Sequence, residues 1–337
     1  MIKIKISVII PTWKRVDILK EVIESLLIQD YPQNNFEVII CDSQSKDGTE
    51  ELIKYYKQSK PNFNIKLNNS IINAQSIKRN DGAKIAKGEI LIFLDDDVIP
   101  SKSLVTEYSN AHQGSKNNIF LGLSLFSKER AKNSNLLTYR NERAKKIIGN
   151  DKLISPENFV SMNFSIKKKD FLKIGMFDPI FTNYGGEDHD FPIRMKEMGF
   201  SSKFCSGAKS EHKEPSPNLY GRMKKVFISA NKGFVPLKNK FPSFFVNSTI
   251  GLLEEKNPDD SINTKIKKYF INYLLIKFFV KPIARFLCWS DNRSFFYQPI
   301  LFRIVFAFSY LEGVKARDKN LQSETTFDSW KFWSRYI

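Results

Sequence analysis

Short runs of β-branched residues alternate with longer, helically spaced segments over the first hundred residues. The apolar runs predict strands at 6–10, 36–41, 65–67 and 89–94. Between them, apolar residues recur every three or four positions and predict helices at 16–29, 49–57 and 76–87. Strands that alternate with helices are typical of parallel sheets with crossover helices. We therefore predict an α/β fold with a Rossmann-like, mostly parallel sheet flanked by helices.

The pattern is weaker after residue 100. We interpret a stretch rich in lysine and asparagine, 127–151, as mobile or covering structure. A returning strand is predicted at 159–166, and further helices are predicted from Lys169 and at 188–198. Near Pro215 the composition becomes basic and aromatic. We therefore predict two domains, 1–215 and a helical region at 216–337.

Three consecutive aspartates, Asp95, Asp96 and Asp97, follow the apolar strand 89–94. Adjacent carboxylates repel one another, so a strand end tolerates them where water or a cation offsets the repulsion. Ligands of open α/β sheets sit at the carboxyl ends of such strands, and oxygen ligands suit Mg²⁺ or Mn²⁺. The alternative is a solvated acidic turn.

Two other acidic sites follow predicted strands or loops. Asp42 comes just after the strand 36–41, where it can accept hydrogen bonds from a nucleobase or ribose, and Asp47 suits ordinary turn chemistry. Glu187 and Asp188 follow two glycines at a predicted helix N-terminus, which favours an ionised carboxylate able to act as a base. An acidic N-cap without further duty is the alternative.

Composition narrows the class of protein. Hydrophobic residues make up 42% and charged residues 26% of the 337 residues, close to globular averages. Three widely spaced cysteines exclude a disulfide scaffold and a thiolate zinc site, and no export signal is evident, so we expect a cytoplasmic protein. The net charge is +17, and residues 216–337 carry 20 basic and 9 acidic side chains, so most of the excess lies there.

Four segments together resemble the family 2 glycosyltransferases, which have the nucleotide-sugar-binding GT-A fold. They are SVIIPTWKR at 7–15, CDSQSKDGTEEL at 41–52, KRNDGAKIAKGEILIFLDDDVIP at 78–100 and YGGEDHDFPIRMKEMG at 184–199. Their order and spacing are those of the family, over about 200 of the 337 residues. The last segment is also similar to the GGED stretch of metal-dependent galactosyltransferases and chondroitin-type polymerases.

The resemblance implies roles for individual residues. Pro11, Thr12 and Trp13 would lie against the nucleotide base, and Asp42 would hydrogen-bond it. Arg79 would face the donor, and Asp96 would lie near the ribose. The aspartates at 95 and 97 match the DxD metal motif, with Asp97 as the direct ligand. Asp188 matches the catalytic base, and Glu187 would orient the acceptor or the base.

The three histidines are interpreted separately. His212 lies 24 residues beyond Asp188, where many relatives supply a further metal ligand, and we favour that role. His112 follows a helical stretch and is predicted to lie on the surface. His189 faces either solvent or substrate.

The resemblance implies an inverting, metal-dependent transfer from a nucleotide-diphosphate sugar, UDP-sugar by default, to a hydroxyl of a glycan or lipid-linked acceptor. A divalent ion, Mn²⁺ or Mg²⁺, would neutralise the leaving diphosphate while one carboxylate takes the acceptor proton. One alternative is a sugar nucleotidyltransferase, although the glycine-rich loop typical of that class is missing after the first strand. Another is a non-catalytic basic module for membrane or nucleic acid, but charge alone does not explain two acidic loops, and we expect no nucleic-acid partner. A pseudoenzyme is the third.

The C-terminal region mixes basic and aromatic residues. Its two apolar runs, 269–280 and 295–311, are interrupted by polar residues, and neither predicts a confident spanning helix. Cations interleaved with aromatic residues favour peripheral docking at an anionic membrane surface, at the cytoplasmic face. A soluble helical cap and true insertion are the alternatives. The sequence leaves the oligomeric state and the donor sugar open.

Overall fold

The computed structural model describes residues 5–148, 153–247, 253, 261–262, 265 and 276–319. The chain divides into two compact units. The first unit comprises Met1–Ser127, Glu142–Thr182 and Glu187–Pro215. The second unit comprises Lys128–Asn141, Asn183–Gly186 and Ser216–Ile337. Two short segments from within the predicted 1–215 domain thus belong to the second unit.

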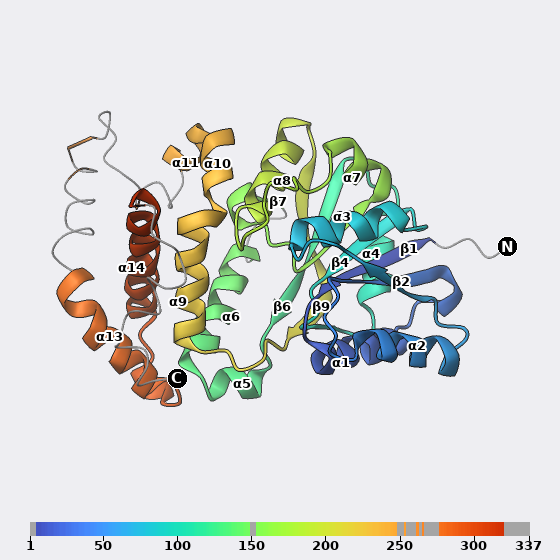
Figure 1. The fold of residues 1–337 in the computed structure, drawn as a ribbon, viewed down its shortest axis with the longest axis horizontal. Helices are drawn as coiled ribbons and strands as arrows, with labels where there is room; N and C mark the ends of the chain where they lie inside the picture. The colour runs from blue at the N-terminus through green and yellow to red at the C-terminus, as the bar shows by residue number, and fades with distance from the viewer. Residues whose placement is uncertain are drawn as a thin grey trace. The chain divides into compact units, whose positions relative to one another are not determined.

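Nine strands of the described chain form one sheet in the order β3-β2-β1-β4-β8-β6-β9-β5, and β7 pairs with β9 (Figure 1). Its first half is parallel, as the sequence predicts. It contains β1 (Ile6–Thr12), β2 (Phe36–Asp42), β3 (Ile65–Asn69) and β4 (Ile90–Leu94). All four strands were predicted within a few residues. β1, β2 and β4 are mostly apolar and buried, whereas β3 buries only Ile65.

The second half of the sheet is mixed. Its strands are β5 (Val98–Pro100), β6 (Asn118–Leu125), β7 (Leu153–Ile154), β8 (Asn163–Lys167) and β9 (Ser201–His212). β8 runs antiparallel to both β4 and β6, whereas β6 and β9 are parallel. Of these strands, the sequence predicts only β8. The long β9 escapes notice because its residues include many lysines and serines.

Helices cover both faces of the sheet. They are α1 (Val16–Leu27), α2 (Thr49–Ser59), α3 (Gln75–Ile85), α4 (Leu104–Ala111), α7 (Lys168–Ile174) and α8 (Glu187–Glu197), with 3₁₀ turns at Gln33–Asn35 and Pro156–Asn158. Alternate residues of β1 enter opposite cores, as a strand requires. Val8 and Ile10 join the cluster that contains Leu19 of α1, and Ile9 joins the cluster around Phe93 and Phe171. The prediction of an α/β fold is confirmed.

Two sequence interpretations need correction. Within the stretch 127–151, taken as mobile or covering structure, the described residues form α5 (Lys128–Lys132) and α6 (Asn135–Ile148), and residues 149–151 lie outside the described residues. His112 is wrong as a surface residue, since only 4% of it is exposed. Its Nε2 lies 3.0 Å from the Ser165 hydroxyl, and its ring meets Phe120 edge-on. Burial lowers the pKa of His112 to about 4, so the ring is neutral.

The second unit is helical where it is described. After α9 (Leu219–Ile228) come a π-helical turn at Ser229–Gly233, α10 (Val235–Lys240) and α11 (Pro242–Asn247), then α13 (Ile276–Ser290), a 3₁₀ turn at Ser294–Phe296 and α14 (Pro299–Asp318). Its core joins residues of α6, α9, α13 and α14, among them Tyr139 stacked on Phe302. Gly233 allows a close approach of the Tyr184 carbonyl, which would lie 2.2 Å from any added Cβ.

Among the described residues, no helix has both the length and the apolar composition needed to cross a membrane. The predicted run 269–280 lies mostly outside the described residues. The second run, 295–311, falls in the turn before α14 and in α14 itself, which buries Phe302, Val305 and Phe308 in the second unit.

Candidate active site

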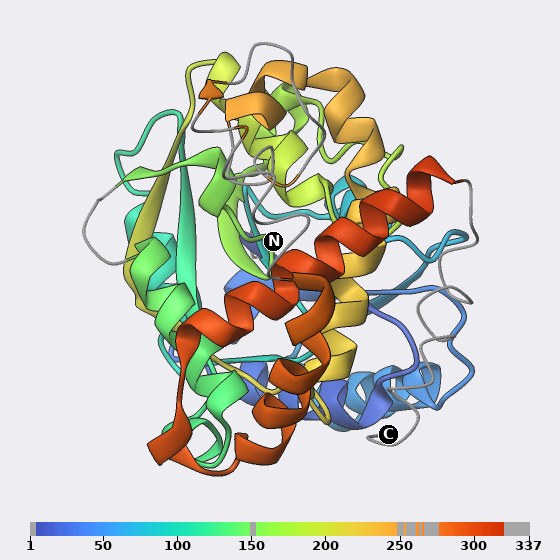
Figure 2. The same ribbon diagram turned by 90° about the vertical axis from the view of Figure 1, so that its left-hand side faces the viewer.

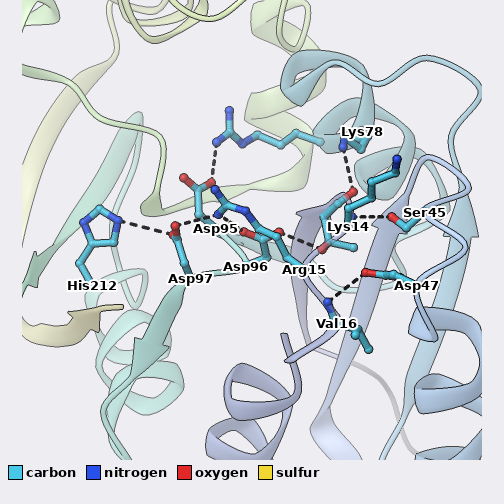
Figure 3. Close-up of polar contacts among 12 residues, drawn as sticks. Lys14, Arg15, Val16, Ser45, Asp47, Lys78, Asp95, Asp96, Asp97 and His212 are labelled. Carbon is cyan, nitrogen blue, oxygen red and sulfur yellow. Dashed lines mark hydrogen bonds and ion pairs between the residues drawn. The ribbon is translucent and has the colours of Figure 1, made fainter. Parts of the chain in front are cut away.

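The site begins where the parallel strands end. Thr12 and Asp42 are the last residues of β1 and β2, and they are paired in register. β4 lies on the other side of β1 and leads directly into Asp95, Asp96 and Asp97. Because parallel strands end at one edge of a sheet, the side chains of Thr12, Asp42 and the three aspartates gather there. Figure 3 shows Asp95, Asp96 and Asp97 side by side. We call this cluster, together with Glu187, Asp188 and His212, the carboxylate edge.

Arg15 bridges two of the three aspartates. Its Nη1 lies 2.9 Å from Asp96 Oδ1 and 2.8 Å from Asp97 Oδ2 (Figure 3). The Thr12 hydroxyl donates to Asp96 Oδ2 at 2.8 Å. The sequence reasoning assigned Arg15 no role, although it closes the segment SVIIPTWKR. The available signal was the presence of a cation beside one motif and of three carboxylates in another, because opposite charges attract.

The carboxyl groups of Asp96 and Asp97 differ in pKa. Burial raises the pKa of Asp96 to about 6, although Arg15 and Thr12 favour its ionised form. Burial also acts on Asp97, but hydrogen bonding and charge from His212 and Arg15 outweigh it and lower the pKa of Asp97. Asp97 is therefore the more firmly ionised of the two.

His212 reaches Asp97 through strand pairing. β5 and β9 are antiparallel, and Val98 is the register partner of His212. This places His212 Nε2 at 3.5 Å from Asp97 Oδ1, and the Phe126 ring stacks on the imidazole at 4.7 Å. Both side chains are buried. The sequence-predicted pair of Asp97 and His212 is thus brought together.

The donor set can be tested against a divalent ion. Across the described residues, no group of three or more His, Cys, Asp or Glu side chains is placed to hold a metal ion alone. Asp97 and His212 nevertheless present an oxygen and a nitrogen 3.5 Å apart, close to the roughly 3 Å between neighbouring ligands of an octahedral ion. Ions of this kind take few protein ligands and complete their shell with water and substrate phosphates. The residues fit such an ion.

Arg79 neutralises the third aspartate. It is fully buried and donates from Nη2 to Asp95 Oδ1 at 2.7 Å, and its guanidinium lies 5.4 Å from the Phe177 ring centroid. Asp188 and Glu187 are also close enough to act on its charge. Its Nε and Nη1 are buried, and neither has a hydrogen-bond partner among the described residues. Buried N–H groups of a cation left unpaired are a place where an anion would be stabilised.

Glu187 and Asp188 open α8 and lie beside β8. The Ser161 N–H donates to Asp188 Oδ1 at 3.3 Å, and the neighbouring Met162 carbonyl accepts from the Asp95 N–H at 3.0 Å. The backbone before β8 therefore ties Asp188 to the aspartates after β4. This physical link joins the two acidic motifs that lie about 90 residues apart in the sequence.

The two carboxyls share their protons unequally. Burial, then the charge of Asp188, raises the pKa of Glu187 to about 8. Burial also raises the pKa of Asp188, but Arg79 and Ser161 oppose this. Glu187 Oε2 is buried without a hydrogen-bond partner. The neutral form therefore belongs to Glu187 and the ionised form to Asp188. His189, next along, has its pKa lowered to about 4 by burial and is neutral.

Lys78 is a second cation that the sequence reasoning missed. Only 1% of it is exposed, and its Nζ donates to the Thr12 carbonyl at 2.8 Å and to Asn73 Oδ1 at 2.7 Å. Burial lowers the pKa of Lys78 to about 8, against the charges of Asp96 and Asp42. It therefore holds the end of β1 and supplies positive charge between two acidic strands. Its position beside Arg79 in the segment KRND was the available signal.

An open hollow of about 640 Å³ adjoins these groups. Trp13, Lys14 and residues 43–47 line it. Trp13 is 44% exposed, whereas Pro11 and Thr12 are buried in β1. Asp42 accepts hydrogen bonds from both the backbone N–H, at 2.8 Å, and the hydroxyl of Ser45. Of the three residues predicted to face a base, Trp13 is the one with an exposed ring.

The loops around this hollow carry strained backbone. Lys14, Gln44 and Lys46 have φ between 53° and 54°, a region that non-glycine residues seldom occupy. They are held by hydrogen bonds from Lys14 N–H to the Ser45 hydroxyl, 2.8 Å, and from Val16 N–H to Asp47 Oδ2, 3.0 Å. Burial disfavours ionised Asp47, but hydrogen bonds from Thr49 and Val16 lower its pKa overall. Strain that is stabilised in this way is common at binding sites.

Comparison with known sequences matches residues 7–177 to the model of glycosyl transferase family 2, and residues 151–215 to the N-terminal domain of galactosyltransferase. An uncharacterized glycosyltransferase of Bacillus subtilis is 27% identical over 263 residues, 64% of this chain and 66% of that protein. A GalNAc(5)-diNAcBac-PP-undecaprenol beta-1,3-glucosyltransferase of Campylobacter jejuni is 30% identical over 202 residues, 58% of this chain and 61% of its own.

A poly(ribitol-phosphate) beta-glucosyltransferase of Bacillus spizizenii is 34% identical over 119 residues, 35% of this chain and 19% of that protein. The chain thus spans between about a fifth and two thirds of the length of these curated relatives.

Solved structures with the same fold are more distant in sequence. A mannosyltransferase of Pyrobaculum calidifontis, in complex with GDP-Man and Mn²⁺, matches with a TM-score of 0.59 at 15% identity, over 94% of this chain and 88% of its own. Residues 1–349 of TarS from S. aureus, in complex with UDP, match with a TM-score of 0.53 at 15% identity, over 94% and 92%. The GT-A-like fold predicted from the sequence is confirmed by these matches. Since the family model covers half of the chain, the chain belongs to glycosyl transferase family 2.

Proposed function

We propose that this protein transfers a sugar from a nucleotide-diphosphate donor to an acceptor hydroxyl, with a divalent metal ion and with inversion at the anomeric carbon. One observation carries the proposal. Asp188 is tied through Ser161 and Met162 to Asp95, so that a candidate base and the aspartate cluster lie at one edge of the sheet. A base facing a charge-stabilised leaving group is the arrangement that a single displacement needs.

The donor end of the proposed site is the hollow beside β1 and β2. Trp13 offers an exposed ring against which a base can stack, and Asp42 lies buried behind it with oxygen acceptors. Asp96, near Thr12, would accept from a ribose hydroxyl. The unpaired N–H groups of Arg79 would take phosphate oxygens. Uridine is the first base to test, because a matching fold is known with UDP bound.

Asp97 and His212 would hold the metal ion in this proposal, with Asp95 nearby. When bound, the ion would supply positive charge that stabilises the leaving diphosphate. Arg15 already bridges Asp96 and Asp97. Its guanidinium therefore balances the acidic cluster when no ion is bound, and it would have to rotate away or share Asp97 when one is.

At the acceptor end, Asp188 would take the proton of the attacking hydroxyl. Ser161 and Arg79 favour its ionised form, as a base requires. Glu187, held neutral by burial, can donate a hydrogen bond and would orient Asp188 or the acceptor. Only Asp188 acts as an acid or base here, because the leaving diphosphate needs charge neutralisation rather than a proton.

The proposed acceptor is a glycan or a lipid-linked precursor. The names of two relatives point to acceptors of these kinds, a poly(ribitol-phosphate) chain and an undecaprenyl-diphosphate glycan. Such precursors are assembled at a membrane, so we propose a cytoplasmic enzyme that works at the inner membrane surface. The charge of +17 suits that setting.

A panel of nucleotide sugars tests the proposal. Purified protein is mixed with UDP-, GDP- and dTDP-sugars in Mn²⁺, Mg²⁺ or chelator, and thermal stability and released nucleoside diphosphate are measured. One nucleotide that stabilises the protein only with metal, and an acceptor-dependent release that Asp188→Asn abolishes, are expected. Product formed with retained anomeric configuration, read by NMR, would contradict the proposed displacement.

A further inference from the structure

The turn between α13 and α14 exposes aromatic side chains. Figures 1 and 2 show the two helices joined at one end by this turn, which contains the 3₁₀ helix Ser294–Phe296. Phe295 is 90% exposed, and Trp289, at the end of α13, is 52% exposed. Burial of such rings is strongly favourable, so their exposure on a folded unit indicates a contact surface.

The exposed rings form one cluster. Phe296 contacts two other exposed rings, Trp289 and Phe295, with ring centroids 5.2 and 5.3 Å apart, and the half-buried ring of Phe286 at 6.2 Å. An open hollow of about 500 Å³ beside the cluster is lined by residues 285, 286, 288 and 289. We call the side chains of Arg285, Phe286, Trp289, Arg293, Phe295 and Phe296 the aromatic-basic tip.

Cations surround these rings. The Arg293 guanidinium lies 4.6 Å from the Trp289 ring centroid, and Arg285 is exposed one helical turn before Trp289. Lys281 lies a further turn back, so that positions 281, 285 and 289 share one face of α13. Exposed Arg303 follows in the first turns of α14.

The one acidic side chain in the turn is engaged elsewhere. Asp291 accepts hydrogen bonds at 2.8 Å from the Leu136 N–H and from the Ser134 hydroxyl. It therefore satisfies backbone at the start of α6 and holds the turn in place. The other charged residues of the described stretch 281–303 are all cations.

We propose that the aromatic-basic tip docks on a lipid bilayer that contains anionic phospholipid. Aromatic rings beside arginines match the boundary between headgroups and acyl chains, where rings insert and guanidinium groups meet phosphates. A second copy of this chain is a poorer occupant, because a two-fold contact would bring like charges together. This docking goes beyond the proposed sugar transfer and does not depend on it.

Vesicle binding of the full chain tests the proposal without donor or acceptor. Vesicles are made of phosphatidylcholine alone, or of equal parts phosphatidylcholine and phosphatidylglycerol, and sedimented at low and high salt. Wild type is expected to bind the anionic vesicles, and salt is expected to weaken binding. Arg285→Glu with Arg293→Glu should weaken binding by about 30-fold, and Phe295→Ser with Phe296→Ser by about 10-fold.

Matched controls come from α2 of the first unit. Lys54→Glu with Lys57→Glu changes two exposed cations by the same charge, and Tyr55→Ser removes a ring that is 59% exposed. Both should bind vesicles like wild type. Brominated lipids should quench fluorescence in wild type more than in Trp289→Phe. Thermal unfolding of each variant shows that it is folded.

Three results would overturn the proposal. One is equal binding of wild type to vesicles with and without phosphatidylglycerol. Another is tip variants that are folded and bind as tightly as the α2 controls, which would place docking elsewhere on the chain. A self-associating protein that does not bind vesicles would also overturn it and would favour a second copy as the occupant.

Discussion

The carboxylate edge and the aromatic-basic tip use charge in opposite ways. At the edge, three carboxylates lie against a cation: Asp95 against Arg79, and Asp96 and Asp97 against Arg15. At the tip, arginines are exposed and lie beside exposed rings. We propose a partner outside the chain for both regions, but of the two only the edge holds charges that folding removes from water.

The two regions differ in the free-energy cost of their charges. Buried charges are expensive unless paired, so their arrangement is fixed and small changes are severe. Exposed charges are screened by water and salt, so the tip contributes little to stability and acts through many weak attractions. The edge is therefore suited to chemistry at defined atoms and the tip to a soft, extended partner.

The largest expected effect is on turnover, and it separates the chemical step from donor binding at the carboxylate edge. Asp188→Asn removes the proposed base and keeps its shape, so turnover should fall by about 10² to 10⁴-fold while donor affinity stays within about twofold. Rates of diphosphate release and donor titration measure the two quantities. Turnover within a factor of ten of wild type would show that another group takes the proton.

Removing a buried cation tests whether the edge depends on pairing. Arg79→Met leaves the partly buried Asp95 without its partner and should lower the free energy of unfolding by about 2 kcal/mol, because Asp95 loses a charge-assisted hydrogen bond from a buried cation. Denaturant unfolding at neutral pH measures it. The matched change Lys84→Met, at an exposed pair with Asp81, should cost less than about 1 kcal/mol. Equal losses would contradict the contrast.

Lys78 should make the free energy of unfolding depend on pH. Its pKa is lowered to about 8 in the folded protein, against about 10.4 in the unfolded chain. Between these values the unfolded chain binds a proton that the folded protein has lost, so the free energy of unfolding should rise with pH, relative to Lys78→Met. The slope should approach about 1.4 kcal/mol per pH unit. A constant difference between pH 8 and pH 10 would show that Lys78 keeps its ordinary pKa.

Glu187 should make the free energy of unfolding change with pH in the opposite direction. Its pKa is raised to about 8, against about 4.3 unfolded, so the folded protein holds the extra proton. The stability that it contributes is present below about pH 4.3 and is lost as the pH rises towards 8. Wild type should therefore lose stability relative to Glu187→Gln across that window. Unfolding curves at pH 5, 6 and 7.5 measure the trend, and parallel curves would assign the proton to Asp188 instead.

The smallest effect belongs to the tip. Phe295→Ser changes a side chain that is 90% exposed, so the free energy of unfolding should change by no more than about 0.5 kcal/mol. The same measurement on Phe302→Ser, a buried residue of α14, should show a loss of about 3 kcal/mol or more. A large loss for Phe295→Ser would mean that the ring packs within the second unit.

The parallel strands and their carboxylates could be predicted, but their partners could not. β1, β2 and β4 are continuous apolar runs, and Asp42 and Asp95 stand where those runs end. The partner of Asp96 depends on strand order, which brings Arg15 next to it from 81 positions away. Local pattern shows that a cation and the carboxylates are available, but strand order decides which of them meet.

The interpretations of His112 and of the stretch 127–151 were incorrect for the same reason. His112 ends a helix with polar neighbours, and its burial depends on Ser165 of β8 and Phe120 of β6. The stretch 127–151 looks like polar loop. Its α6 is stabilised at the start by Asp291, over 150 residues later, which accepts from Leu136 N–H. Long-range partners decide both cases.

The most direct test of the account is calorimetric titration of a nucleoside diphosphate, UDP first, into wild type and Asp97→Asn, each with Mn²⁺ or with chelator. If the carboxylate edge forms one metal-assisted donor site, wild type should bind at least about tenfold more tightly with Mn²⁺ than with chelator. Asp97→Asn should bind weakly in both conditions. Equal affinity in all four titrations, for a nucleotide that does bind, would contradict the account.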